Sequence, residues 1–184
     1  FLAGFAILAL FWHGHHRFSR NFGLEDGTIV FLSLALVAAT MFYVYPLRMV
    51  MSAAMMFFTG GWAPSEFRVR DMTEFRLIFV IYGVGFAVLA TIIAWMNAHA
   101  LRKAEQLRLD AAERRAARAE VMALIALVGC AVLSVLLALA IPEGRGWMHA
   151  LPGLAYGLLG VLMPWMSIHY GRRVRALAAG RGKR

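Results

Sequence analysis

The sequence predicts an all-α membrane protein, a helical bundle with five transmembrane helices visible and a sixth expected before residue 1. Hydrophobic residues make up 61% of the 184 residues, whereas soluble domains are closer to roughly half apolar. Charged residues make up 16% and gather between long apolar runs rather than inside them. The runs do not alternate apolar and polar residues, as the strands of a membrane barrel would.

Five apolar runs mark the expected spans, since a helix of about 20 apolar residues crosses a hydrocarbon core of about 30 Å. These spans are residues 1–16, 29–58, 75–100, 121–141 and 149–170. Pro46 marks a point where the second span could break, because proline lacks a backbone donor. Residues 101–120 are rich in strong helix formers and are expected to extend the third span into the cytoplasm. The transmembrane helical domain therefore covers residues 1–171, and a basic cytoplasmic tail covers 172–184.

The distribution of Lys and Arg predicts how the bundle is oriented. The first and third connections and the tail contain 14 of the 19 Lys and Arg residues. Because cytoplasmic segments carry the excess of these residues, the C-terminus is expected in the cytoplasm, at a bacterial inner membrane. Five spans with that orientation leave Phe1 outside, so one more helix is expected before it. Orientation also accounts for the net charge of +9, and no nucleic-acid partner is predicted.

Residues that could carry chemistry are few. The predicted spans are nearly free of ionisable side chains, which argues against a carrier that moves protons through buried carboxylates. Histidines lie at span ends and could ligate a haem or a metal in facing pairs, so a bis-His haem protein remains an alternative. These are His13, His15, His16, His99 and His169. No phosphate-binding glycine loop, nucleophile elbow or His-Glu-x-x-His motif is present, so neither an enzyme activity nor a cofactor or metal is predicted.

Small residues indicate where helices can approach closely. Gly83 and Gly85 lie in the third span, and Gly153 and Gly157 have the Gly-x-x-x-Gly spacing in the fifth. Without Cβ atoms, both pairs are expected to allow tight helix contacts.

The end of the first span carries the most specific motif, Trp-x-x-His-His-Arg followed by an aromatic residue. Its residues are Trp12, His15, His16, Arg17 and Phe18. This string resembles the end of the second helix in the transmembrane-protein-175 family, the potassium channels of lysosomes and many bacteria. The leucine-rich segment that ends at Pro46 looks like the third helix of that family, and the resemblance covers nearly the whole chain.

The resemblance implies a homotetramer of six-span subunits in the lipid bilayer that conducts potassium ions as a leak channel through a hydrophobic constriction. The family's pore helix, with its Arg-x-x-x-Phe-Ser-Asp motif, is absent from this chain, so the constriction is unassigned. The resemblance also implies that Trp12, His15, His16 and Arg17 belong to a polar network that braces the pore helix. Which of the two histidines contacts that helix is left open. Ser33 replaces the Asn of many relatives, and a contact there is expected to be weaker. The alternative is a non-conducting membrane scaffold, an accessory subunit or a small transporter.

Overall fold

The computed structural model describes residues 2–62, 71–142, 148 and 151–159. Four long helices follow one another: α1 (Leu2–Phe22), α2 (Gly27–Phe58), α3 (Met72–Arg102) and α4 (Ala111–Ala140). Residues 151–159 are also helical, and the described part of the chain contains no strand. The all-helical class expected from the apolar runs is therefore confirmed.

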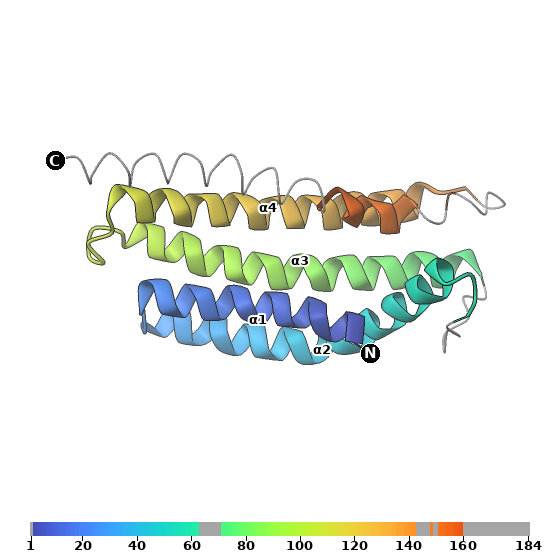
Figure 1. Cartoon of the computed structure of the whole chain (residues 1–184), viewed down its shortest axis with the longest axis horizontal. Helices are drawn as coiled ribbons and strands as arrows, with labels where there is room; N and C mark the ends of the chain where they lie inside the picture. The colour runs from blue at the N-terminus through green and yellow to red at the C-terminus, as the bar shows by residue number, and fades with distance from the viewer. Residues whose placement is uncertain (1, 63–70, 143–147, 149–150, 160–184) are drawn as a thin grey trace.

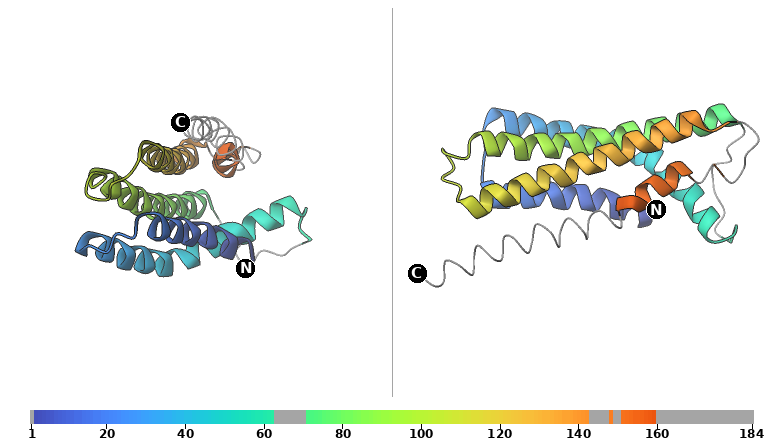
Figure 2. Two further views of the ribbon diagram at one scale, coloured as in Figure 1. Left: turned by 60° about the vertical axis from the view of Figure 1, so that its left-hand side comes forward. Right: turned by 90° about the horizontal axis from the view of Figure 1, so that it is seen from above.

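Consecutive helices run antiparallel, and α3 lies in the middle of the bundle (Figure 1). It packs against α4 on one side and against the α1–α2 hairpin on the other. Figure 2 shows the same three layers from two further directions, with the helical residues 151–159 beside α4. Because α3 contacts every other long helix, it forms the centre of the packing.

Three of the helices are long and apolar enough to cross a membrane: Gly27–Met56, Thr73–Arg102 and Ala111–Ala140. These confirm an integral membrane protein, but five spans are not found among the described residues. The helix α1 does not meet the same criterion, and the polar residues from His13 to Arg17 interrupt its apolar run. Most of the span expected at 149–170 lies outside the described residues.

Pro46 does not end the second helix. The helix α2 continues through it to Phe58 and changes direction in its second half (Figure 1). A proline inside a helix removes one backbone hydrogen bond and clashes with the preceding turn, which bends the helix without stopping it when neighbouring packing holds both halves. The break considered from the sequence is therefore a bend.

The third helix is shorter than expected, because residues 103–120 do not continue it. The helix α3 ends at Arg102, a turn follows, and Arg108 adopts a left-handed backbone conformation with φ of 51°. Asp110 then starts α4 with a capping box: its Oδ1 accepts from the backbone N–H of Glu113 at 2.8 Å, and Glu113 Oε2 accepts from the Asp110 N–H at 2.8 Å. Two satisfied backbone donors favour a new helix here, so residues 111–120 belong to α4.

Aromatic rings fill the middle of the bundle. Phe11 of α1 meets Phe86 of α3 edge-on at 5.1 Å between ring centroids. Tyr156 meets Phe86 at 5.3 Å and Tyr82 at 5.2 Å, and Tyr82 in turn lies 5.7 Å from Tyr43 of α2. Edge-to-face and offset pairs at these distances are favourable beyond the area they bury. This aromatic cluster therefore joins α1, α2, α3 and residues 151–159.

Two glycines of α3 allow the close contacts that the sequence indicates. A Cβ on Gly83 would meet the Val135 side chain of α4, and a Cβ on Gly85 would overlap the Tyr43 ring of α2. Gly153 and Gly157 differ, since no described residue lies within 4 Å of a Cβ built on either of them. Among the described residues, the Gly-x-x-x-Gly spacing therefore marks no tight contact.

Candidate functional site

The Trp-His-His-Arg motif lies in the second half of α1, and its side chains point in different directions because successive residues of a helix turn by about 100°. The Trp12 indole stacks on the His15 ring, with centroids 5.3 Å apart and planes 26° from parallel. His15 Nε2 shares a hydrogen bond of 3.1 Å with the Ser33 hydroxyl of α2. The structure thus brings Trp12 and His15 together, and the Ser33 hydroxyl of α2 is the polar partner of His15.

The other two residues of the motif lie elsewhere. His16 is exposed, and the Arg17 guanidinium forms an ion pair with the Glu120 carboxylate of α4. The next residue, Phe18, is only 2% exposed and packs in a cluster with Ile29, Leu32, Met96 and Ala100. The motif therefore connects α1 to three other helices and does not form one compact polar network within the described residues.

A second polar cluster, which the sequence analysis did not find, joins the α1–α2 turn to the end of α3. Asp26 Oδ2 accepts from Lys103 Nζ at 2.6 Å and from His99 Nε2 at 2.7 Å. Asp26 Oδ1 accepts from the backbone N–H of Ile29 at 2.9 Å, which caps the first turn of α2. The Asp26 carboxylate thus caps the first turn of α2 and also binds the side chains of His99 and Lys103 at the end of α3.

The pKa of the Asp26 carboxyl lies well below its ordinary 3.8, and the hydrogen bond from Lys103 is the main cause. The hydrogen bonds from His99 and from the Ile29 backbone lower the pKa further. Each of these hydrogen bonds favours the charged form of the acid. An acidic residue just before an apolar helix is a sequence signal for a cap. Its two partners, 73 and 77 residues later, could not be inferred from the sequence.

Two further contacts hold the bundle toward its opposite end. Arg76 Nη2 at the start of α3 donates to the Ile141 carbonyl, just past α4, at 3.0 Å. The hydroxyl of Ser134, which is fully buried in α4, donates to the Pro152 carbonyl at 2.8 Å. A buried hydroxyl without such a partner would cost free energy, so this bond fixes where residues 151–159 meet α4.

Two of the histidines considered for haem or metal ligation already have polar partners. His15 and His99 are engaged by Ser33 and Asp26, His13 and His16 are exposed, and His169 lies outside the described residues. Across the described ranges no group of three or more His, Cys, Asp and Glu side chains is arranged to hold a metal ion.

The arrangement of helices is similar to that of known potassium channels. The chain matches no protein-family model. A potassium channel of Marivirga tractuosa is 23% identical over 158 residues, which are 83% of this chain and 64% of that protein, so the chain spans less than two thirds of its length. A crystal structure of a variant of the potassium channel MtTMEM175, in complex with a Nanobody–MBP fusion protein, has a TM-score of 0.72 and 26% identity, covering 94% of this chain and 77% of that one. The resemblance to the transmembrane-protein-175 potassium channels, first indicated by the Trp-His-His-Arg motif, is confirmed in both sequence and fold.

Proposed function

We propose that this chain is a subunit of a homotetrameric, potassium-selective leak channel in a bacterial inner membrane, with its C-terminus in the cytoplasm. The likeness to the potassium channel MtTMEM175, at a TM-score of 0.72 and 26% identity over 94% of the chain, carries this proposal. Ions pass a hydrophobic constriction on a pore helix that precedes residue 1, and the described helices form the scaffold around that helix.

The interior of the described bundle supports a scaffold role, because few of its buried residues are polar. Its buried polar residues are Asn97 and Ser134. Asn97 Nδ2 donates to the Ile93 carbonyl at 2.9 Å, and Ser134 donates to the Pro152 carbonyl. Charged side chains inside a membrane bundle usually mark ion or proton pathways, and among the described residues no Asp, Glu, Lys or Arg is buried. The proposal therefore places conduction outside this bundle, at a surface shared between subunits.

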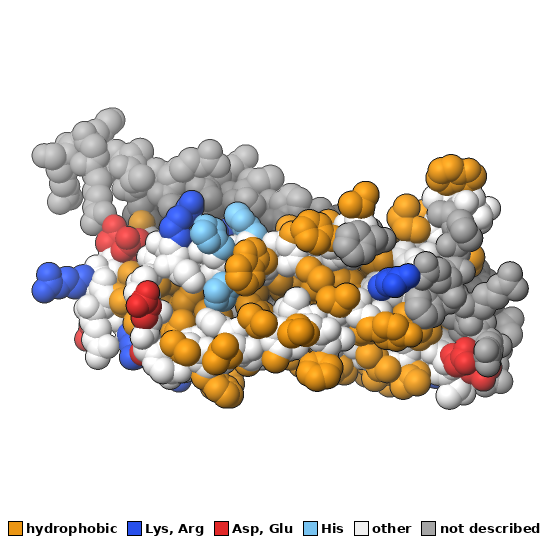
Figure 3. Space-filling view, turned by 90° about the horizontal axis from the view of Figure 1, so that it is seen from below, with side chains coloured by type: hydrophobic (Ala, Val, Ile, Leu, Met, Phe, Trp, Pro, Cys, Tyr) orange, Lys and Arg blue, Asp and Glu red, His pale blue; other side chains and the backbone are white. Residues whose placement is uncertain are grey.

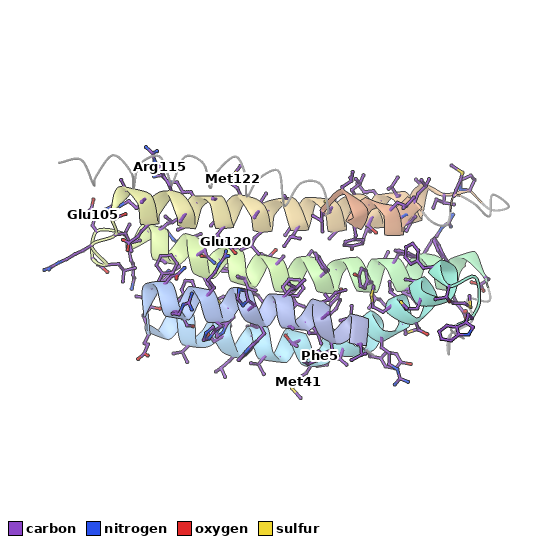
Figure 4. The ribbon with its side chains drawn as sticks, in the orientation of Figure 1. Phe5, Met41, Glu105, Arg115, Glu120 and Met122 are labelled. Atoms are coloured by element: carbon purple, nitrogen blue, oxygen red, sulfur yellow. The ribbon has the colours of Figure 1, made fainter. Side chains whose placement is uncertain are left out.

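The outer face of the α1–α2 hairpin suits contact with further helices or with lipid. Phe5 of α1 is 60% exposed and Met41 of α2 is 75% exposed, and both point away from α3 (Figure 4). Figure 3 shows apolar side chains spread over the face seen from below, with His side chains toward one end and charged side chains near both ends. Exposed apolar patches of this kind mark protein or membrane contacts. In the proposal, part of this face packs against the pore helices.

The geometry of the α1 motif favours His15 as the histidine that braces the pore helix in the proposal. Its ring lies between the Trp12 indole and the Ser33 hydroxyl, so its orientation is set from both sides. Trp12 is 61% exposed and His16 is also exposed, and both are free to meet a helix outside the described bundle. Arg17 contributes indirectly, because its ion pair with Glu120 holds α1 in place.

Potassium and sodium flux from proteoliposomes tests the proposal, using full-length protein that includes the residues before Phe1. Potassium-selective flux that protein-free liposomes do not show is the expected result. Absence of flux from folded, oligomeric protein would contradict the channel and favour the non-conducting scaffold. Flux of both ions without preference would contradict the selectivity and leave a channel of another kind.

A further inference from the structure

One end of the bundle carries a ring of exposed arginines. The helices α1 and α3 end there, and α2 and α4 begin there (Figure 1). Five exposed arginines project from the last turns of α1 and α3, from the α3–α4 turn and from the first turns of α4. We call this set the arginine collar; its members are Arg20, Arg102, Arg108, Arg115 and Arg118.

Most carboxylates at this end are already engaged by other groups. Asp26 binds Lys103, Glu120 binds Arg17, and the capping box of α4 binds backbone N–H groups. Over the residues that the structure describes, no collar guanidinium forms an ion pair. Two further acids here, Glu25 and Glu105, are exposed. The collar therefore presents an excess of cationic groups to its surroundings.

The collar arginines of α1 and α3 lie at the same depth relative to the membrane. Trp12 is 61% exposed and precedes Arg20 by eight residues, and Trp95 is 54% exposed and precedes Arg102 by seven. At about 1.5 Å per residue both arginines lie roughly 10–12 Å beyond an indole ring. Exposed indoles favour the boundary between acyl chains and headgroups, so these guanidinium groups reach the depth of the lipid phosphates.

The helix α4 shows the same change from apolar to cationic surface. Arg115 and Met122 both point to the side of α4 that faces away from α3 (Figure 4). Met122 is 50% exposed and lies seven residues further along, about 10 Å deeper. Arg118 is exposed one turn from Arg115. Three helices thus place exposed arginines at a common level above an exposed apolar surface.

We propose that the arginine collar binds the headgroups of anionic phospholipids in the leaflet at that end of the bundle. Guanidinium groups bind phosphate oxygens through paired, charge-assisted hydrogen bonds. Apolar side chains directly below the collar, such as Met122, accommodate the acyl chains of the same lipid. The partner is a lipid and not free phosphate, because cationic and apolar surfaces adjoin. This inference requires only membrane insertion and does not depend on potassium conduction.

The test measures energy transfer from the protein's tryptophans to pyrene-labelled phosphatidylglycerol or phosphatidylcholine in vesicles. The wild-type chain is expected to enrich the anionic lipid around itself. Each basic residue near a membrane surface contributes roughly fivefold in affinity, so Arg115→Gln/Arg118→Gln should reduce the preference about 25-fold. Arg115→Lys/Arg118→Lys keeps the charge and should retain most of it. Both positions are exposed, so folding, checked by gel filtration, is expected to persist.

A variant that should change the lipid preference in the opposite direction strengthens the test. Glu25→Gln/Glu105→Gln removes two exposed acids and should raise the preference for phosphatidylglycerol. A preference unchanged by the Arg→Gln substitutions in folded protein would overturn the proposal. So would loss of the preference on adding millimolar inorganic phosphate at constant ionic strength, because it would identify a site for the free anion. Retention of the preference in phosphate supports the lipid.

Discussion

Replacing Gly85 by Ala should destabilise the bundle, although alanine favours helix. The added Cβ would lie 2.7 Å from Cε2 of Tyr43 and closer still to its Cδ2. Tyr43 is 2% exposed and packs against Tyr82 at 5.7 Å between ring centroids. The ring therefore has no space into which it can swing, and the two helices must separate.

The magnitude follows from two opposing contributions. Overpacking a filled core costs about 1–3 kcal/mol, and a ring held on all sides favours the upper part of that range. Ala in place of Gly in a helix returns up to about 1 kcal/mol. The net loss is about 2 kcal/mol, which corresponds to a fall in melting temperature of roughly 4–8 °C for a chain of this size.

Gly129→Ala is the matched control, since Gly129 lies inside α4 and no described residue lies within 4 Å of a Cβ built on it. Only the helix-propensity gain operates there, so its melting temperature should stay level or rise by a few degrees. Gel-filtration thermostability in detergent measures both variants at one protein concentration. Equal or higher stability of Gly85→Ala would refute the close packing of α2 on α3.

Three further changes test the polar contacts. Asp26→Asn should lower the melting temperature at pH 7. Because the folded-state pKa of Asp26 lies below its ordinary 3.8, its contribution exists above that value and fades as pH falls toward the folded pKa, so the wild-type and variant curves should converge in acid. Ser134→Ala removes a buried hydrogen bond and should cost about 1–2 kcal/mol, or roughly 2–8 °C. His15→Ala should reduce potassium flux in proteoliposomes more than His16→Ala, since only His15 is held by Trp12 and Ser33.

Each of these changes has its own control. A constant difference between Asp26→Asn and wild type down to pH 3 would contradict the charged contacts of that carboxylate. Ser134→Cys leaves no cavity and retains only a weak S–H donor, so a loss equal to that of Ser134→Ala assigns the effect to the hydrogen bond and not to a cavity. Equal flux loss for the two histidine variants would remove the reason to prefer His15.

Length and composition predicted most of the fold. Apolar runs between charged connections indicated long membrane helices, and α2, α3 and α4 confirm this. The break near residues 103–110 was missed, because Ala, Arg and Glu favour helix on both sides and only the Asp110 capping box starts a new one. The first span, expected at residues 1–16, does not meet the length and hydropathy criterion that α2, α3 and α4 meet, because the second half of α1 is polar.

The sequence by itself determined the class of the protein, the helix pattern and the family likeness, because these depend on local composition and on one short motif. Only the tertiary structure decided which side chains meet. His15 contacts Ser33 across 18 residues, and Asp26 contacts Lys103 across 77. The motif residues also separate, with Arg17 turned to α4 and His16 left exposed. Such pairings arise from how α1, α2 and α4 pack around α3, and helix periodicity alone does not specify that packing.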